Sequence, residues 1–509
     1  MDHSQDFLEH EQVQKDIDVG RVLGPFARPP FPNAKCPQQP RINRIFSVPK
    51  NKYNPADPTR RTIFHFSYPN YFSKNHLTPR NDAEMNYDTF RKILEAIAGM
   101  GKGTVMFFVD VKSAYKLLNI NPQEWFLQVF RIGKEFFVGL TGMFGDVAAG
   151  DNWDRFMGVL LAILRRLFPE VIWFCYVDNI VGLIPPLNGR IPNWFLAVPT
   201  FKKFISLTKD IGLPIHDEIE PTLKVENCLG WGIDTDKELV FIKPERMLHI
   251  CTHLKTYAEG KVSERMFVTQ SVFDSLVGII SFCSQILLCL KGPLRFFIET
   301  QTEYRKKSQK DSVGLGKREI FACKWILYYF GQWEGVIPIC RTVWLGTHLR
   351  IVTDAGTTPV FPNGVMWGMG AHCIETGGYF SEAWNPEIVD QSRTIKTRHI
   401  SVPFLETFTV LTAVLTFGRD NMNIHVQTDN TSAAQICSSR WCNTNDILNK
   451  YIAFYEFQCA KRGILVQVEQ KDRKFNPGAH HLAAGDVEQA TRYAQLTTPY
   501  LAARLHQLF

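Results

Sequence analysis

The pattern of apolar and polar positions changes character several times along the chain. Residues 1–45 alternate charged residues with proline clusters and show no sustained period, so we expect an extended arm that lies on the body of the protein or is partly mobile. From Ser47 onward, short runs rich in β-branched and aromatic residues predict strands. Asp82–Met100 has helical spacing and stops at Gly101, where a helix is expected to end.

The next block alternates short apolar runs with amphipathic stretches. It predicts, in order, a buried strand (104–111), a hairpin (126–131 and 134–139), an amphipathic helix (153–168), two strands folded around 177–179, a helix near 199–211 and strands near 229 and 240. The order β-α-β-β-α-β is typical of a split βαβ sheet.

Residues 244–335 are nearly all helical by period, and the α/β character returns from Trp344. The predicted elements of this last block are strands at 349–356, 364–373 and 377–384, a helix at 404–418, a strand at 422–430, a helix at 446–462 and a strand at 464–470.

Length and composition limit the classes of protein. A chain of 509 residues suggests three or four domains, and 45% hydrophobic with 21% charged residues excludes global disorder, collagen and a coiled-coil rod. The 12 cysteines form no C-x-x-C pair, which argues against zinc ribbons and indicates a reducing intracellular compartment, cytoplasmic or nuclear. The longest apolar stretch, Val277–Leu290, is too short to span a bilayer, so we expect a buried helix and no membrane partner.

Net charge adds little by itself. A formal charge of +7 is compatible with a polyanionic partner but does not require one.

Two predicted strands end in aspartates. Asp110 closes VMFFVD, and Asp178 lies in the turn of FCYVDN. A carboxylate beside a buried strand is costly unless something compensates it, and a divalent metal is a common compensation. If the two strands are neighbours, both carboxylates project at one edge and can share two Mg²⁺ ions for phosphoryl transfer. The alternative is that each aspartate only caps a turn.

The segments around these aspartates resemble the palm motifs of retroelement reverse transcriptases. DVKSAY (Asp110–Tyr115), FGDVAAG (Phe144–Gly150) and YVDN (Tyr176–Asn179) resemble D-x-x-x-A-Y, F-G-x-x-x-A-P and Y-x-D-D in the same order. SVPKNK with RRTIFHFSYP resembles the fingers strands, and CLGWGIDT resembles the primer-grip hairpin. The resemblance is nearest to long-terminal-repeat-type and DIRS-like retrotransposon polymerases.

This resemblance implies a role for each matching residue. Tyr115 would lie under the incoming sugar and disfavour a 2′-hydroxyl. Phe144 and Gly145 would pack at the nucleotide and template. The implied metal ligands are Asp110 and Asp178 with the Val111 carbonyl, and the implied phosphate-binding residues of the fingers are Lys50, Lys52, Arg60 and Arg61.

The chain departs from the family pattern at three places. Asn179 replaces the second aspartate of Y-x-D-D, which keeps an oxygen ligand but removes one negative charge; negative-strand RNA virus polymerases resemble this choice with G-D-N. The usual A-P is Ala149–Gly150 here. A lysine general acid is expected near 212–224, where only Lys224 is available.

A second set of carboxylates occupies the C-terminal block. Asp354 and Asp429 end strands, Glu406 lies inside an apolar helix, and Asp486 follows a Pro-Gly turn. A glutamate on an apolar helix face needs a partner, and two strand-end aspartates around metal would provide one.

These segments resemble ribonuclease H. T-D-A-G, L-E, T-D-N and a later P-G…D follow the family order, which implies that Asp354, Glu406 and Asp429 are metal ligands. Asp486 is one residue away from the family spacing, so Glu488 is its rival as fourth ligand. His480 and His481 are candidates for assisting proton transfer or product release; a loop histidine can also be merely solvated.

The resemblance implies an α/β and α+β multidomain fold, a right-hand polymerase (fingers, ferredoxin-like palm, helical thumb) followed by a ribonuclease H-like α/β domain. The expected segments are an N-terminal extension (1–45), fingers and palm (46–243), thumb and connection (244–340) and ribonuclease H (341–509). We expect RNA-directed DNA polymerase and ribonuclease H activities with two Mg²⁺ (or Mn²⁺) ions per site, acting on an RNA template, a DNA primer, RNA–DNA hybrid and deoxynucleoside triphosphates. The rival hypotheses are a domesticated nucleic-acid-binding scaffold that has lost polymerisation, favoured by Asn179, and an enzyme active only as a hybrid nuclease. The oligomeric state stays open.

Overall fold

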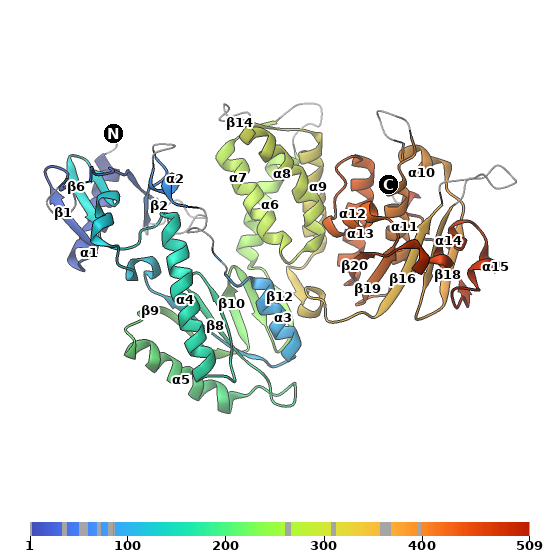
Figure 1. The fold of residues 1–509 in the computed structure, drawn as a ribbon, viewed down its shortest axis with the longest axis horizontal. Coiled ribbons are helices and arrows are strands. Elements are labelled where there is room, and N and C mark those ends of the chain that lie inside the picture. The colour runs from blue at the N-terminus through green and yellow to red at the C-terminus, as the bar shows by residue number, and fades with distance from the viewer. Residues whose placement is uncertain are drawn as a thin grey trace. The chain divides into compact units, whose positions relative to one another are not determined.

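The computed structural model describes residues 3–32, 38–49, 60–68, 73–79, 85, 87–259, 266–306, 312–356, 368–393 and 399–507. The chain divides into two compact units. Figure 1 shows the fold, with the colour running from the N-terminus to the C-terminus. Unit 1 comprises Met1–Leu229 with Ile233–Lys237, and unit 2 comprises Gly230–Gly232 with Glu238–Phe509. Among the described residues, no helix combines the length and the apolar character needed to cross a bilayer.

The central sheet of unit 1 has the predicted β-α-β-β-α-β order, but its last strand lies at 215–222, where the sequence predicted none, and the strands predicted near 229 and 240 lie outside this sheet. Its four strands pair in the antiparallel order β7-β8-β4-β9. The strands and their two helices are β4 (Val105–Val111), α4 (Val147–Leu167), β7 (Ile172–Tyr176), β8 (Asn179–Ile184), α5 (Trp194–Asp210) and β9 (Ile215–Thr222).

The core of this sheet follows from the two-residue period of β4. Val105, Phe107, Val109 and Val111 are almost fully buried and pack in one cluster with residues of α4 and α5. Alternate side chains of a strand point to opposite faces, so Asp110 points away from the face that the two helices cover. The strand therefore places its one carboxylate outside the apolar core.

The remaining elements of unit 1 include those that form a second core around Phe64, Phe130 and Phe137. The predicted hairpin is confirmed as β5 and β6, with β1 added in the order β1-β6-β5. These elements are α1 (His3–Asp18), β1 (Val22–Phe26), β2 (Ile45–Pro49), β3 (Arg60–Phe64), α2 (Lys74–Leu77), α3 (Phe90–Met100), β5 (Val129–Ile132), β6 (Glu135–Gly139) and β10 (Lys224–Cys228); β11 (Trp231–Asp234) spans the boundary between the units.

The prediction of an extended N-terminal arm is wrong for its first part, because His3–Asp18 forms helix α1. Val13 is 1% exposed in the same cluster as Phe64, and Lys116 Nζ lies 2.6 Å from the Asp16 carboxylate. The helix carries few apolar residues, and contacts with distant parts of unit 1 stabilise it.

Unit 2 begins with the helical block that the period of 244–335 predicts. Its elements are β12 (Leu239–Phe241), α6 (Pro244–Ala258), β13 (Met266–Thr269), α7 (Gln270–Ser284), α8 (Lys291–Lys306), β14 (Ser312–Leu315), α9 (Lys317–Gln332) and β15 (Val336–Pro338). The predicted helix over Val277–Leu290 ends earlier than expected, since α7 stops at Ser284 and a short 3₁₀ turn covers Leu288–Leu290.

A six-stranded sheet follows, in the order β20-β19-β16-β17-β18-β21. β16, β17 and β18 are antiparallel neighbours, whereas β19 and β20 add in parallel. The elements are β16 (Leu349–Ala355), β17 (Met369–Cys373), β18 (Gly378–Glu382), α10 (Pro386–Gln391), α11 (Val402–Phe417), β19 (Asn423–Thr428), α12 (Thr431–Ser439), α13 (Asp446–Arg462), β20 (Leu465–Gln470), α14 (Pro477–Ala483), α15 (Val487–Ala490) and β21 (Thr498–Pro499).

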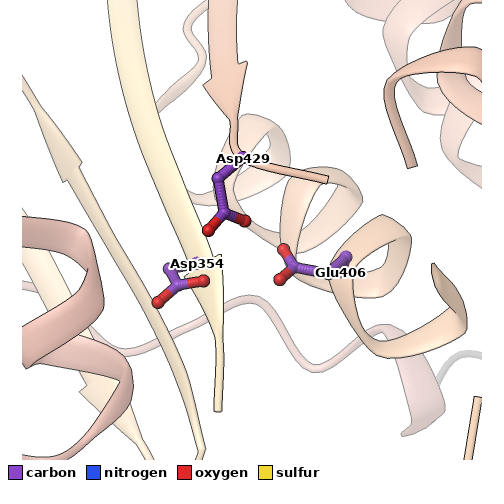
Figure 2. Close-up of side chains that lie close together, drawn as sticks. All are labelled: Asp354, Glu406 and Asp429. Atoms are coloured by element: carbon purple, nitrogen blue, oxygen red, sulfur yellow. The ribbon is translucent and has the colours of Figure 1, made fainter. Parts of the chain in front are cut away.

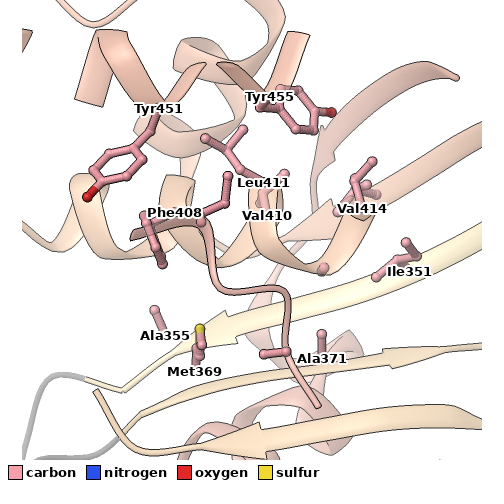
Figure 3. Packing of buried hydrophobic residues seen from close by; sticks show 14 of the residues in the cluster. Ile351, Ala355, Met369, Ala371, Phe408, Val410, Leu411, Val414, Tyr451 and Tyr455 are labelled. Carbon is pink, nitrogen blue, oxygen red and sulfur yellow. The ribbon is translucent and has the colours of Figure 1, made fainter. Parts of the chain in front are cut away.

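Helix α11 is the centre of this core. Figure 3 shows Phe408, Leu411 and Val414 between the sheet and the tyrosines of α13. Nearly every side chain of α11 is buried, including Glu406. An apolar helix held on both sides is a rigid support for a single carboxylate.

Candidate functional site

The first candidate site lies where β4 and β8 of unit 1 meet. Asp110 pairs across the sheet with Asn179, and the Val111 amide donates to the Asp178 carbonyl at 2.9 Å. The register therefore brings Asp110, Asp178 and Asn179 to the same end of two adjacent strands, as the sequence predicts. Val111 itself is buried beside them.

Helix α4 holds the turn that carries Asp178. Val177 has a φ of +56°, which is uncommon for a β-branched residue. Its carbonyl accepts a hydrogen bond of 2.6 Å from Trp153 Nε1, and Trp153 is fully buried in the core. This hydrogen bond from the core holds the strained turn, so packing sets the direction of the Asp178 backbone.

An aromatic pair lies at the second motif. The rings of Tyr115 and Phe144 meet edge to face with their centroids 5.3 Å apart. Gly145 has a φ of +104°, and a Cβ there would lie 2.1 Å from the Phe64 carbonyl oxygen. Only glycine fits this position, because both the backbone conformation and the space exclude a side chain.

Lys74 is a residue of this region that the sequence did not single out. Its ammonium forms an ion pair with Asp146, and the two side chains are 9% and 2% exposed. Asp146 also caps α4 by accepting from the Ala148 amide at 3.2 Å. The acidic start of α4 is therefore compensated: Asp151 pairs in turn with Arg155 at 2.9 Å.

The phosphate-binding prediction lies largely outside the described part of the chain. Lys50 and Lys52 fall outside the described residues. The backbones of Arg60 and Arg61 belong to β3, which pairs with β2. The side chains of both arginines lie outside the described part of the structure. These four residues stay predictions.

Lys224 lies away from Asp110. Asp217 of β9 pairs with Asp110, whereas Thr222 pairs with Met106 near the other end of β4. Lys224 follows Thr222 and is 2.6 Å from Glu226. The register therefore does not support Lys224 as the general acid of this site.

The second candidate site lies in unit 2, where three carboxylates converge. Figure 2 shows Asp354 at the end of β16, Asp429 after β19 and Glu406 on α11, all pointing toward one space. One oxygen from each lies within 4.8 Å of the others. Parallel pairing of β16 and β19 puts both aspartates at the same edge, as predicted from the sequence.

Local signals in the sequence build this geometry. Ser401 caps α11 by accepting from the Phe404 amide at 3.3 Å, which starts the helix one turn before Glu406. Asn430 caps α12 by accepting from the Ala433 amide at 2.9 Å, directly after Asp429. Two helix caps and the register of one strand pair therefore fix the positions of the three carboxylates.

The electrostatics of the three carboxylates favour a bound cation. Burial, and then the charges of Asp354 and Asp429, raise the pKa of Glu406 to about 9. Burial and the charge of Asp354 also raise the pKa of Asp429, against the opposing effect of Arg473. A divalent cation would remove this repulsion, because all donors are the oxygen ligands that Mg²⁺ and Mn²⁺ prefer.

Two basic side chains adjoin the three carboxylates. His480 Nδ1 lies 2.8 Å from Asp354 Oδ2, and Arg473 lies 3.0 Å from His480 Nε2 and 4.0 Å from Asp429. The Asp354 carboxylate can only accept, so His480 Nδ1 donates to it, and the Arg473 guanidinium lies 2.6 Å from the same Nδ1. Arg473 was not predicted from the sequence, since a charge in a polar loop carries no local signal.

The structure brings together three of the four predicted ligands. Asp486 is exposed and caps α15 by accepting from the Gln489 amide at 3.0 Å. Its rival Glu488 is also exposed, and neither belongs to the group of three. The ring of His481 stacks on Tyr493 at 5.4 Å. A fourth ligand stays a prediction.

Comparisons with known proteins give a distant likeness. No family model and no curated protein sequence matches this chain. Among solved structures, the chain is similar to a foamy viral protease–reverse transcriptase "dRH" with double-stranded DNA (11% identity, TM-score 0.45, 92% of this chain and 70% of that chain). It is also similar to foamy viral protease–reverse transcriptases with double-stranded DNA (11%, 0.43, 92% and 84%) and with an RNA/DNA hybrid (12%, 0.44, 91% and 53%).

Proposed function

We propose that the chain is an RNA-directed DNA polymerase of the retroelement type, long-terminal-repeat or DIRS-like, with a ribonuclease H activity in unit 2. The observation that carries the proposal is the convergence of Asp354, Glu406 and Asp429 within 4.8 Å on a six-stranded sheet. Type, order and local sequence of these residues also match the ribonuclease H pattern.

The nuclease site fits divalent cations. Asp354, Glu406 and Asp429 would hold them, and a bound cation would favour the charged form of Glu406, which is 3% exposed and has a raised pKa. Bound Mg²⁺ ions would activate water and stabilise the charge that develops on an RNA phosphate. The protein contributes the fixed spacing of its carboxylates, and Arg473 and His480 add positive charge and proton donors at the rim.

The polymerase site would use Asp110 and Asp178 in the same way. Tyr115 and Phe144 would contact the incoming deoxynucleotide, and the primer 3′-hydroxyl would attack its α-phosphate in line. The partners of this site are an RNA template, a DNA primer and deoxynucleoside triphosphates.

A second candidate function is a hybrid nuclease whose unit 1 only binds nucleic acid. The observation that favours it is the Asn179 amide, which donates to the Asp178 carboxylate at 3.1 Å where the family pattern has a second aspartate. This contact occupies an oxygen that a metal would otherwise use.

Two assays on one preparation separate the candidates. We would measure extension of a DNA primer on an RNA template and cleavage of the RNA in a labelled hybrid, both with Mg²⁺ and with Mn²⁺. The bifunctional proposal expects Asp110→Ala to abolish extension only and Asp429→Asn to abolish cleavage only. Asp420→Asn, which changes an exposed carboxylate paired with Arg462, is the matched control. If the parent protein cleaves the hybrid but does not extend the primer, the second candidate is supported. If the parent protein shows neither activity, both candidate functions are overturned.

A further inference from the structure

A cavity of about 220 Å³ lies in unit 2, at the end of α9 and beside the last turns of α13. Most of its lining side chains are apolar or aromatic, and three are charged. The aromatic and charged lining residues are Tyr329, Trp333, Glu334, Arg341, Phe457 and Lys461. None of the three nuclease carboxylates lines this cavity, so it is a separate feature of unit 2.

Arg341 lines the cavity from the 3₁₀ turn Ile339–Arg341. Its Nε is buried and has no hydrogen-bond partner in the part of the chain that the structure describes. Arg341 also lines a second, smaller space of about 40 Å³, where the carboxylate of Glu456 is paired with Arg440 at 2.8 Å. Arginine keeps its charge in proteins, so a buried N–H of its guanidinium is costly when no acceptor faces it. An anion in either space would supply that acceptor.

The backbone of α13 makes room for this guanidinium. Gly463 ends the helix at a φ of +65°, and a Cβ there would lie 2.3 Å from Arg341 Nε. Both the left-handed backbone and the approach of the arginine therefore favour glycine at this position. The partial negative charge at the end of the helix attracts the guanidinium. Arg341 is thus held against the end of α13, at the wall of the cavity.

The aromatic part of the wall is also fixed in place. Trp333 Nε1 donates to the Val336 carbonyl at 2.6 Å. The rings of Trp333 and Tyr329 are stacked with their centroids 6.2 Å apart, and Phe457 meets Tyr329 edge to face at 5.9 Å. Rings that are already ordered bind a flat apolar group at a low cost in entropy.

Charge and volume restrict the ligand. The two cations Arg341 and Lys461 outnumber the single carboxylate, Glu334, so the cavity favours an anion over a cation. Pockets for drug-sized ligands usually measure about 300–1,000 Å³, and this cavity is smaller. It therefore suits a ligand with about one ring.

We propose that this cavity binds a small aromatic anion, a single flat ring that carries a carboxylate or a phosphate monoester. Arg341 holds the anionic group through charge-assisted hydrogen bonds, and the rings of Trp333 and Tyr329 contact the ring of the ligand. The inference concerns residues of unit 2 outside the three carboxylates, so it does not rest on the proposed polymerase or nuclease function.

The test measures binding of five probes to the full chain by isothermal titration calorimetry. EDTA is present throughout, because it removes the metal-dependent nucleotide binding that we propose for unit 1. Benzoate and uridine monophosphate carry a ring with an anionic group, benzamide and uridine are their neutral counterparts, and inorganic phosphate lacks the ring. We expect at least one ring-bearing anion to bind about tenfold more tightly than its neutral counterpart and than inorganic phosphate. The tighter of the two identifies the anionic group as a carboxylate or a phosphate.

Two variants connect this binding to the cavity. Arg341→Met is expected to weaken the preferred anion about tenfold, which corresponds to about 1.4 kcal/mol. Arg350→Met, which removes an exposed guanidinium paired with Glu375 at 2.7 Å, is the matched control and should bind like the parent. Trp333→Leu removes a flat surface and should weaken binding severalfold, and it keeps the test decisive if Arg341→Met fails to fold.

Three results would overturn the inference. The first is that neither ring-bearing anion binds more tightly than its neutral counterpart and inorganic phosphate. The second is a folded Arg341→Met that binds the preferred anion as tightly as the parent does. The third is unchanged binding by Trp333→Leu, because the aromatic wall would then make no contact with the ligand.

Discussion

Asn179 Nδ2 donates a hydrogen bond of 3.1 Å to Asp178 Oδ1, between two residues adjacent in the turn from β7 to β8. The amide partly neutralises a carboxylate that we propose as a metal ligand. We expect Asn179→Asp to lower the Mg²⁺ concentration for half-maximal primer extension about tenfold, since it adds a charged ligand beside Asp178. Extension rates measured over a Mg²⁺ series check this.

A second measurement on this variant needs no activity. Without metal, two adjacent carboxylates repel each other, so Asn179→Asp should unfold at a lower temperature than the parent in EDTA and recover in Mg²⁺. Asn188→Asp makes the same change of charge in an exposed loop of unit 1 and should show neither effect. If the parent and Asn179→Asp need the same Mg²⁺ concentration for half-maximal extension, Asn179 does not weaken metal binding at this site.

The raised pKa of Glu406 predicts how the metal-free stability depends on pH. The pKa is about 9 in the folded chain against an ordinary 4.5, so between these values the folded state binds more protons than the unfolded state. The contribution of Glu406 is therefore fully present below about pH 4.5 and is lost as pH rises toward 9. We expect the free energy of unfolding of unit 2 in EDTA to fall from pH 5 to pH 9.

Urea titrations at pH 5, 7 and 9 measure this dependence. Glu406→Gln should flatten the slope, because an amide does not titrate, whereas Glu488→Gln, an exposed glutamate outside the three carboxylates, should leave it unchanged. Mg²⁺ should stabilise the parent more at pH 9 than at pH 5, because Glu406 is charged in a larger fraction of the molecules at pH 9. A parent whose stability is flat over this range would contradict the raised pKa.

The buried ion pair of Lys74 and Asp146 supports the start of α4 and hence the Phe144–Gly145 motif. Lys74→Met leaves the Asp146 carboxylate buried without its cation, and we expect a loss of about 3–5 kcal/mol in the unfolding free energy of unit 1. Lys92→Met breaks an exposed pair with Asp88 at 3.2 Å and should cost at most about 1 kcal/mol. Similar losses in the two variants would show that Lys74 and Asp146 are solvated.

Local signals explain which elements could be predicted from the sequence. Helix α13 begins and ends at Asp446 and Arg462, as its pattern indicated, because Asn445 caps it and Gly463 ends it at a φ of +65°. Asp354 and Asp429 could be placed at one sheet edge because each closes a short apolar run. In each case the decisive information lies within a few residues of the feature.

Other features depend on contacts between residues far apart in the chain. Helix α1 has too few apolar residues to be recognised, and its ion pair joins Asp16 to Lys116. Lys74 meets Asp146 across 72 residues, and Tyr87 meets Gly150 across 63. Single polar residues in irregular segments carry no period and no motif, so tertiary packing alone reveals them.

Two threonines in α11 give the last prediction. The hydroxyls of Thr407 and Thr412 are buried without a hydrogen-bond partner among the described residues, whereas Thr409 donates to the Leu405 carbonyl at 2.9 Å. Valine has nearly the shape of threonine, so Thr412→Val removes an unsatisfied polar group without leaving a cavity. We expect it to raise the unfolding free energy of unit 2 by about 1 kcal/mol, and Thr409→Val to lower it by about 0.5–1 kcal/mol. Urea unfolding followed by tryptophan fluorescence compares the two on one helix. If both variants lose the same stability, the Thr412 hydroxyl is satisfied in solution, and the α11 core is wetter than its packing indicates.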